Sequence, residues 1–222
     1  MIDEEKVLAG WLADIHALRG RSEVLDYGCG RGRMAVVAVR AGHHVVGVDA
    51  SPHMRAESAR AGLQSLSPDE FTASSSTHDI IILSHIIEHF APGDLHRFLV
   101  GLFDRMKPNG YVIVATPLLS PWFHDDFDHV RPYHPKGLLM AFSGGRSEQL
   151  QYASPYRLEL EDIRFRRAPF QISFARRLYT SRGLRWPRPA NRLLRAAFLL
   201  SGHLIGRTDG WMGLFRLRRD PP

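Results

Sequence analysis

Several residues near the N-terminus have the types and spacing needed to hold a ligand that carries both a charged group and hydroxyl groups. Gly28, Gly30 and Gly32 form a G-x-G-x-G turn directly after a short apolar segment. Glycine permits a tight turn and leaves no Cβ between the backbone and a ligand. Asp26 precedes this turn and can accept hydrogen bonds from a cationic amino group. Asp49 ends the next apolar segment, where a carboxylate can accept both hydroxyls of a ribose. The alternative is that both aspartates only stabilise turns.

A second set of polar residues, His85, Glu88 and His89, follows the apolar run at residues 79–84. Histidine is the usual base near neutral pH. His85 and His89 are four residues apart, so on a helix both could reach one metal ion, and a distant histidine such as His129 could complete the ligand set. The alternative is that Glu88 and His89 only hold a loop. Because spacing alone seldom establishes ligation, we favour the metal-free interpretation and assign no metal ligand.

A third set lies in residues 123–133, which combine aspartates, histidines and an arginine. We predict that His129 is the catalytic base, with His85 or His89 as the alternatives. Asp128 and Arg131 are predicted to bind the acceptor substrate, since a guanidinium pairs bidentately with a carboxylate or phosphate. The alternative is a loop that an ion pair between Asp128 and Arg131 holds in place.

All three sets fall at the ends of predicted strands. Apolar spacing predicts an opening helix from Val7 to Leu18, stopped by Gly20. Strands and helices then alternate, which predicts a parallel sheet with helices on both faces. Ligands of such sheets bind beyond the carboxyl ends of the strands, so the three sets should meet there. The predicted strands are 23–27, 44–49, 79–84 and 111–117, and the predicted helices are 33–41, 51–60 and 94–106, the last capped by Asp94.

The remaining segments have weaker patterns. Residues 63–71 could hold a short strand, 72–77 are predicted to be loop, and 108–110 are predicted to be a turn. Further predictions are a helix at 135–142, strands at 156–165 and 211–217, and an apolar, arginine-dotted helix at 191–205. We expect one domain over 1–222, in which residues 20–117 are the cofactor-binding core. Residues 118–222 supply acceptor-side loops, the last strands and the basic helical insertion.

Composition excludes several classes of protein. The chain has 222 residues, of which 44% are hydrophobic and 23% charged, as in ordinary globular domains. The chain has no apolar run long enough for a transmembrane helix. Its acidic N-terminus lacks a signal core. With Cys29 as the single cysteine, no internal disulfide can form, and we expect a cytoplasmic protein.

The net charge of +6 is concentrated in the C-terminal third, where arginine is abundant from Arg157 onward and acids are few. Such a surface attracts phosphates, nucleic acid, acidic lipids or acidic sugars. The alternative is a solvated basic face without a dedicated partner. For the helix at 191–205 the alternatives are packing on the sheet or over the active site, and peripheral attachment to an anionic membrane.

The motifs together resemble those of a known family. Residues 24–32 resemble the first motif of class I S-adenosylmethionine-dependent methyltransferases, and Asp49 matches the acidic end of the second. Residues 79–89 resemble the fourth-strand motif, and 106–110 are similar to the turn before the fifth strand. The resemblance spans about residues 20–117. It implies a Rossmann-like three-layer α/β sandwich whose seven-stranded sheet is mostly parallel with an antiparallel last strand, and S-adenosylmethionine as cofactor.

The resemblance also implies roles for single residues. Gly28 and Gly30 would contact the methionine part, Asp49 the ribose, and Asp26 the amino-acid end. Ser84 and His85 would line the floor near the methyl group. The expected cofactor contacts are Asp26, Gly28, Gly30, Asp49, Ala50, Ser84 and His85. The family usually places an acidic or polar residue after its third strand to meet the adenine. This chain is short there, and Asp69 is the nearest acid.

Two narrower resemblances bear on the acceptor. In ubiquinone-biosynthesis O-methyltransferases and small-RNA methyltransferases, a Glu-x-x-Glu-His segment at this place helps bind a divalent metal, and here His85 replaces the first glutamate. Residues 123–133 are similar to a segment of bacterial methyltransferases from glycan and surface-polysaccharide pathways. We therefore expect O-methylation of a glycan, glycolipid or small metabolite. The alternatives are an RNA methyltransferase and a non-catalytic binding module with the same fold.

Overall fold

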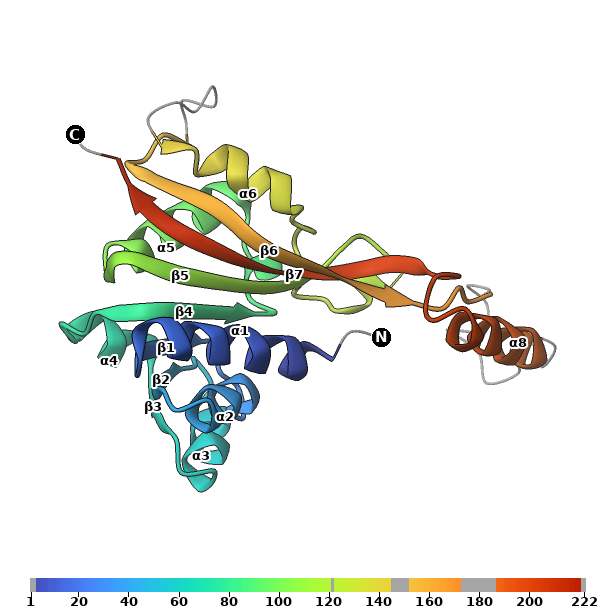
Figure 1. The fold of residues 1–222 in the computed structure, drawn as a ribbon, viewed down its shortest axis with the longest axis horizontal. Helices are drawn as coiled ribbons and strands as arrows, with labels where there is room; N and C mark the ends of the chain where they lie inside the picture. The colour runs from blue at the N-terminus through green and yellow to red at the C-terminus, as the bar shows by residue number, and fades with distance from the viewer. Residues whose placement is uncertain (1–2, 121, 145–151, 173–186, 221–222) are drawn as a thin grey trace.

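The computed structural model describes residues 3–120, 122–144, 152–172 and 187–220. Its strands form one sheet in the order β3-β2-β1-β4-β5-β7-β6 (Figure 1). Strands β1 to β5 pair in parallel, and β7 runs antiparallel to both of its neighbours, β5 and β6. This confirms the predicted sheet. The strands are β1 (Glu23–Tyr27), β2 (His44–Val48), β3 (Gln64–Leu66), β4 (His78–Ser84), β5 (Met106–Pro117), β6 (Tyr156–Ala168) and β7 (Arg207–Arg219).

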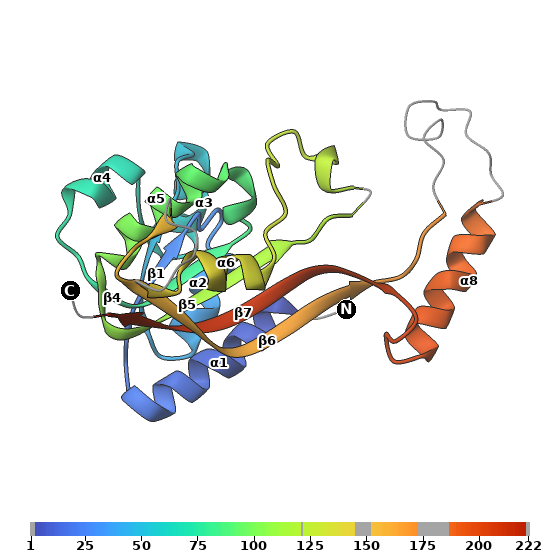
Figure 2. The ribbon, with the colours of Figure 1, turned by 90° about the horizontal axis from the view of Figure 1, so that it is seen from above.

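Helices cover both faces of this sheet, which gives three layers. Leu8 and Leu12 of α1 pack with α2 and one face of β1, whereas Leu99 and Phe103 of α5 pack on the opposite face. Figure 2 shows α1 and α5 on opposite sides of the strands. None of the described helices is long and apolar enough to cross a bilayer. The helices are α1 (Glu4–Arg19), α2 (Arg33–Arg40), α3 (Pro52–Arg60), α4 (Pro68–Ala73), α5 (Pro92–Phe103), α6 (Pro135–Ala141) and α8 (Pro187–Leu200), with short 3-10 turns η1 (Ile87–His89) and η2 (Phe123–Asp125).

Several local predictions were wrong. Residues 68–73 form α4, because Ser67 and Glu70 make a reciprocal capping box and Pro68 stands at the first helical position. The start of the loop predicted at 72–77 therefore belongs to this helix. Helix α5 begins at Pro92 rather than at a cap by Asp94, which lies in the first turn and pairs with Arg97.

The turn predicted at 108–110 is instead an irregular start of β5. Met106 already pairs with His78, and the register shifts before Tyr111 pairs with Ile80. Asn109 takes a left-handed φ of 60°, which accommodates the shift. Met106 therefore belongs to β5 and not to the apolar face of α5.

Strands β6 and β7 are longer than predicted because they continue to pair with each other beyond β5, as far as Ala168 and Arg207. Helix α8 lies at the far end of this hairpin (Figure 1). It begins at Pro187 and ends at Leu200, five residues before the predicted end. The backbone amide of His203 donates to the carbonyl of Phe198, and Gly202 has a φ of 61°, so the chain turns away there.

Candidate active site

The glycine turn between β1 and α2 lies against the ends of β2 and β4. Gly28 has a φ of 77°, and its amide donates to the carbonyl of Val48 at 2.7 Å. A Cβ on Gly28 would lie 1.9 Å from Cδ1 of Ile86, so the turn packs directly on the segment after β4. A Cβ on Gly30 would meet no atom within 4 Å. The backbone at Gly30 is therefore open to an approaching ligand.

Asp26 lies on β1, two residues before this turn, and its side chain is sealed from solvent at 1% exposure. In the described part of the chain neither carboxylate oxygen has a hydrogen bond of normal geometry. Burial raises the pKa of Asp26 to about 7, although the Ala35 amide and the Arg33 charge oppose this rise. Buried carboxylates are ordinarily paired. A ligand that brings a cation or an N–H group beside the turn would supply the missing partner.

Asp49 follows β2 and faces the same turn. One carboxylate oxygen accepts the Gly30 amide at 2.8 Å, and the other accepts the Ser51 amide at 2.8 Å. Each oxygen keeps a second lone pair, so Asp49 can shape the turn and still accept hydroxyl groups. Ala50, the next residue, is exposed. The guanidinium of Arg55 donates to the carbonyls of Asp49 and Ala50 at 2.7 and 3.0 Å, which fixes this corner.

Ser84 ends β4 and is half-buried, and His85 follows it with a left-handed φ of 58°. The imidazole of His85 lies between two carboxylates, with Nε2 at 3.4 Å from Glu4 and Nδ1 at 3.3 Å from Glu88. Hydrogen bonding to Glu4 and then to Glu88 raises the pKa of His85 to about 9. His85 is therefore a cation at neutral pH, beside the open glycine turn.

Glu4 comes from the first turn of α1 and pairs with three cations. It lies 3.4 Å from both His85 and Arg33, and 3.0 Å from Arg166 of β6. Burial alone would raise the pKa of Glu4, but His85, Arg166 and Arg33 together lower it to about 2. Glu4 thus ties the N-terminus of α1 to the glycine turn and to the end of β4.

Glu88 connects the segments that follow β4 and β5. Its side chain is 0% exposed, and one oxygen accepts from the hydroxyl of Thr116 at 2.9 Å. Its backbone carbonyl accepts from the amides of Val130 and Arg131 at 2.9 and 3.1 Å. This fixes the loop that carries the third predicted set of polar residues against the end of β4.

His89 and His129 meet beside Glu88, with ring centroids 5.0 Å apart. Nδ1 of His89 lies 3.1 Å from the Asp128 carbonyl, and Nδ1 of His129 lies 2.8 Å from the Phe123 carbonyl. A carbonyl only accepts, so Nδ1 carries the proton in both rings and Nε2 keeps its lone pair when the ring is neutral. Carbonyl contacts of this kind orient histidines that bind metals or protons.

Glu88, His89 and His129 also form a potential metal-binding group. One ligand atom from each lies within 4.8 Å of the others. His85 is not part of this group, because the helical segment is limited to Ile87–His89. The arrangement in which His85 and His89 share a helical face to reach one ion therefore does not form.

The two predicted acceptor-binding residues are exposed and do not pair with each other. Within the described residues no ion pair joins Asp128 and Arg131, so the loop is held by its backbone contacts to Glu88 and His89 instead. The guanidinium of Arg131 lies 5.7 Å from the ring centroid of Tyr133. Both side chains are free to meet a ligand at the mouth of the site.

Comparison with known proteins identifies the family. A family model described as "Methyltransferase domain" matches residues 3–191, which is most of the chain. This chain belongs to that family. Its fold is that of the class I S-adenosylmethionine-dependent methyltransferases. A crystal structure of an S-adenosylmethionine-dependent methyltransferase from Archaeoglobus fulgidus aligns with a TM-score of 0.57, covering 96% of this chain and 94% of that one at 18% identity.

The similarity to curated proteins is confined to part of the chain. Ubiquinone biosynthesis O-methyltransferase of Rhizobium etli is 31% identical over 101 residues, which is 42% of this chain and 40% of that protein. The chain thus matches less than half of the length of this relative. Magnesium protoporphyrin IX methyltransferase from Synechocystis, crystallised with bound S-adenosylmethionine, aligns with a TM-score of 0.54, covering 96% of this chain and 77% of that one at 12% identity.

The candidate site has the features that S-adenosylmethionine requires. The amino-acid end of the cofactor carries a charged amino group, and Asp26 is a buried carboxylate without a hydrogen bond of normal geometry to any described residue. The ribose offers two hydroxyls, and Asp49 retains free lone pairs beside the open backbone of Gly30. The cofactor of this family therefore fits the residues present. Asp69, by contrast, is exposed in the first turn of α4.

Sequence reasoning missed three residues of the candidate site. Glu4 has the ordinary pattern of an acid in the first turn of a helix, so its spacing carries no signal for a contact with His85. Thr116 lies at the end of a predicted strand but contacts Glu88 only because β4 and β5 are neighbours. Arg55 lies on the polar helix α3, and no sequence pattern indicates that it donates a hydrogen bond to the carbonyl of Asp49.

Proposed function

We propose that this chain transfers the methyl group of S-adenosylmethionine to a hydroxyl oxygen of a small-molecule acceptor. The observation that carries the proposal is the pairing of two features at one edge of the sheet. One is the buried carboxylate of Asp26 beside the open glycine turn, which forms no hydrogen bond of normal geometry with the residues that the structure describes. The other is the pair of imidazoles from His89 and His129, each with Nε2 free to accept a proton.

Bound S-adenosylmethionine would supply an electrophilic methyl carbon, to which the acceptor oxygen would bond while the carbon–sulfur bond breaks and its electron pair stays on sulfur. The proton of the hydroxyl must leave, and we assign it to Nε2 of His129. Asp126 lies 3.7 Å from that nitrogen and stabilises the resulting cation. Asp26 and Asp49 orient the cofactor so that the methyl group faces the acceptor.

His85 has a different role in this proposal. Because Glu4 and Glu88 raise its pKa to about 9, His85 is protonated at neutral pH and cannot accept another proton. The charge of His85 is balanced by the carboxylates of Glu4 and Glu88. We therefore assign His85 to the wall of the site beside Ser84 and not to proton removal. His89 remains the alternative base, since its Nε2 is as free as that of His129.

A second arrangement of the same residues has support of its own. The ligand atoms of Glu88, His89 and His129 can converge on one divalent cation. Buried carboxylate and carbonyl-oriented imidazoles suit Zn²⁺, Mn²⁺ or Fe²⁺. A bound cation would lower the pKa of the acceptor hydroxyl, and Arg131 and Asp128 would still face the acceptor. Loss of turnover after chelation, restored by one of these metals, distinguishes this arrangement from the metal-free base.

The acceptor class is proposed from the surroundings of the histidines. The exposed guanidinium of Arg131 favours an acceptor that carries a carboxylate or phosphate. We propose a glycan, a glycolipid or a related small metabolite, and the partial similarity to ubiquinone biosynthesis O-methyltransferase makes an acceptor from ubiquinone biosynthesis a further candidate. RNA is the alternative, because the C-terminal third is rich in arginine.

The test separates cofactor binding from proton removal. Calorimetry should show binding of S-adenosylhomocysteine that Asp49→Ala weakens and His129→Ala leaves unchanged. Turnover, measured with labelled cofactor on sugar, phenol and RNA acceptors, should fall with His129→Ala. His124→Ala is the matched control, since His124 is an exposed neighbour in the same loop. Full turnover by His129→Ala would refute the base assignment, and absence of cofactor binding would refute the methyltransferase proposal.

A further inference from the structure

Helix α8 presents an apolar face to solvent at the end of the β6–β7 hairpin. Pro189, Leu193, Ala196 and Leu200 recur at helical spacing and are all exposed. Leu193 is 73% exposed and Leu200 is 89% exposed. The turn after the helix adds Leu204 at 72% exposure. Contiguous exposed apolar side chains of this kind mark a surface that binds something.

The opposite face of α8 is already occupied by the hairpin. The side chain of Asn191 accepts from the amide of Ile172 at 2.7 Å and donates to its carbonyl at 3.0 Å. Phe198 is buried, and its ring stacks on His203 with centroids 4.5 Å apart. The contacts of Asn191 and Phe198 therefore fix the orientation of α8, and its leucine face points to solvent.

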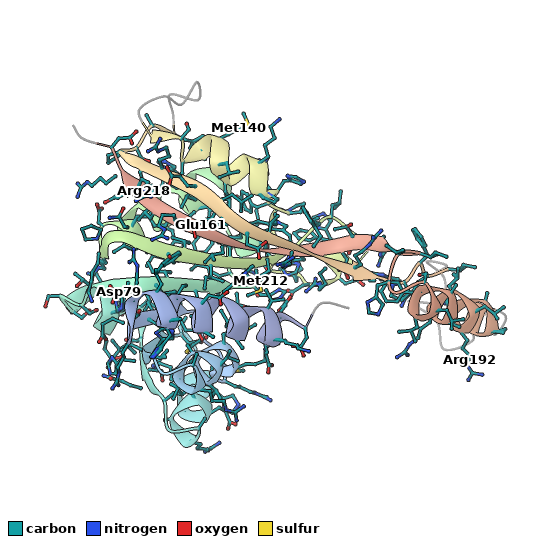
Figure 3. All side chains as sticks on the ribbon, in the orientation of Figure 1. Asp79, Met140, Glu161, Arg192, Met212 and Arg218 are labelled. Atoms are coloured by element: carbon teal, nitrogen blue, oxygen red, sulfur yellow. The ribbon has the colours of Figure 1, made fainter. Side chains whose placement is uncertain are left out.

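Cations lie along one side of this leucine face. Arg192 and Arg195 are exposed, and no ion pair involving either of them is found in the ranges that the structure describes. Figure 3 shows Arg192 pointing from α8 away from the strands. Residues 163–208 contain eleven arginines and no aspartate or glutamate. Arg164 and Arg166 of this stretch pair with acids outside it, so the positive charge beside the leucines in the described structure comes from Arg192 and Arg195.

We propose that this surface of α8 docks the protein on an anionic lipid bilayer. An amphipathic helix with leucines on one face and arginines at its edges lies in the plane of a membrane, with the leucines among the acyl chains and the guanidinium groups at the phosphates. A second copy of the chain fits less well, because a symmetric contact would bring the same arginines together. Nucleic acid also fits less well, because leucines cannot stack on bases as aromatic rings do.

The position of α8 relative to the candidate active site also supports binding to a lipid bilayer. Both β5 and β6 run antiparallel to β7, so β6 ends at the edge of the sheet where β4 and β5 end. Helix α8 lies beyond that edge (Figure 2). A bilayer bound to α8 would therefore lie on the side of the molecule where His89 and His129 are found. If the proposed methyl transfer is correct, an acceptor anchored in the bilayer would approach from this side.

The test uses the full chain and phospholipid vesicles, and it needs neither cofactor nor turnover. Wild-type protein should sediment with vesicles of phosphatidylcholine and phosphatidylglycerol, and much less with phosphatidylcholine alone. The double variant Leu193→Glu, Leu200→Glu should bind at least about tenfold more weakly, because it places charge on the inserted face. Arg192→Gln with Arg195→Gln should weaken binding and reduce its sensitivity to salt.

Leu18→Glu is the matched control, because Leu18 is an equally exposed leucine on α1 (69%). This variant should bind vesicles like the wild type, and all variants should keep the thermal transition of the wild type. Wild-type protein that stays in the supernatant with every vesicle would overturn the proposal. So would a wild-type dimer that Leu193→Glu dissociates, or RNA retention that the leucine variant loses, since each would assign the surface to another partner.

Discussion

The buried carboxylate of Asp26, in the candidate cofactor site, lowers the stability of the folded protein by an amount that can be measured. Replacing it by Asn removes the charge and keeps the shape. Burial raises the pKa of Asp26 from 3.8 to about 7. At roughly 1.4 kcal/mol per pKa unit, the ionised form costs the folded protein about 4 kcal/mol. The Asn amide is left without partners and itself costs about 1–3 kcal/mol. We therefore expect Asp26→Asn to raise the free energy of unfolding at pH 8 by about 1–3 kcal/mol.

The stability difference between Asp26→Asn and the wild type should depend on pH. A carboxyl with a raised pKa in the folded state binds more protons when folded than when unfolded. Wild-type stability from this group is therefore lost as pH rises from 3.8 towards 7. At pH 5 most of that loss has not yet occurred, so the advantage of Asp26→Asn should shrink by about 2–3 kcal/mol between pH 8 and pH 5. At pH 8 the melting temperature should rise by about 3–10 °C.

The same substitution should weaken the cofactor. Loss of a charge-assisted hydrogen bond costs about 1.5–3 kcal/mol, which is about a 10- to 100-fold increase in the Kd of S-adenosylhomocysteine. Urea denaturation and calorimetry on the same samples measure both quantities. Asp79→Asn is the control, since Asp79 is paired with Lys107 at 2.8 Å and this substitution should lower stability at pH 8. Equal stability of Asp26→Asn and wild type at every pH would refute the reasoning.

Three further predictions test the contacts around the site. Glu4→Gln should lower the pKa of His85, now about 9, towards 6.5, as measured by NMR titration. Because a raised histidine pKa stabilises the fold fully below pH 6.5 and loses this contribution as pH rises to about 9, the variant should be more destabilised at pH 6 than at pH 10. Gly28→Ala should cost about 2–5 kcal/mol in urea denaturation, since the left-handed φ and the overlap with the neighbouring side chain add, whereas Gly101→Ala, at an exposed position of α5, should cost nothing. Glu88→Gln removes the second carboxylate beside His85 and should lower the same pKa, with a loss of about 1–3 kcal/mol in unfolding free energy; an unchanged His85 pKa in both glutamate variants would show that these contacts do not form in solution.

Most of the fold and part of the candidate site could be predicted from the sequence because the signals are local. The β-branched run that becomes β4 predicts a strand buried on both faces, and all of Ile80–Leu83 is buried. The glycine turn and the two aspartates are also signalled locally, since each motif is recognised from the apolar segment that directly precedes it in the chain. Gly28 takes the left-handed conformation that its type allows, and Asp49 closes the turn from the end of the neighbouring strand.

The extent of α4 and the start of β5 were predicted wrongly, the first because local signals conflict and the second because it depends on strand pairing. Pro68 and Ser67 are local capping signals, but they lie beside a serine-rich stretch that favours loop. The start of β5 depends on its pairing with β4, and a register shift between two strands leaves no mark in either sequence. Pairing partners, rather than propensity, set these boundaries.

The amino-acid sequence by itself determined the sheet, its helices, the cofactor turn and the abundance of arginine near the C-terminus, because periodicity and turn chemistry act over a few residues. The tertiary structure alone decided that Glu4 holds His85, and that His89 meets His129 from forty residues away. It also decided that α8 stands at the end of a long hairpin with its leucines outward. Contacts of this kind depend on which strands are neighbours and on which face each helix packs, and these follow from burying one shared core rather than from any local pattern.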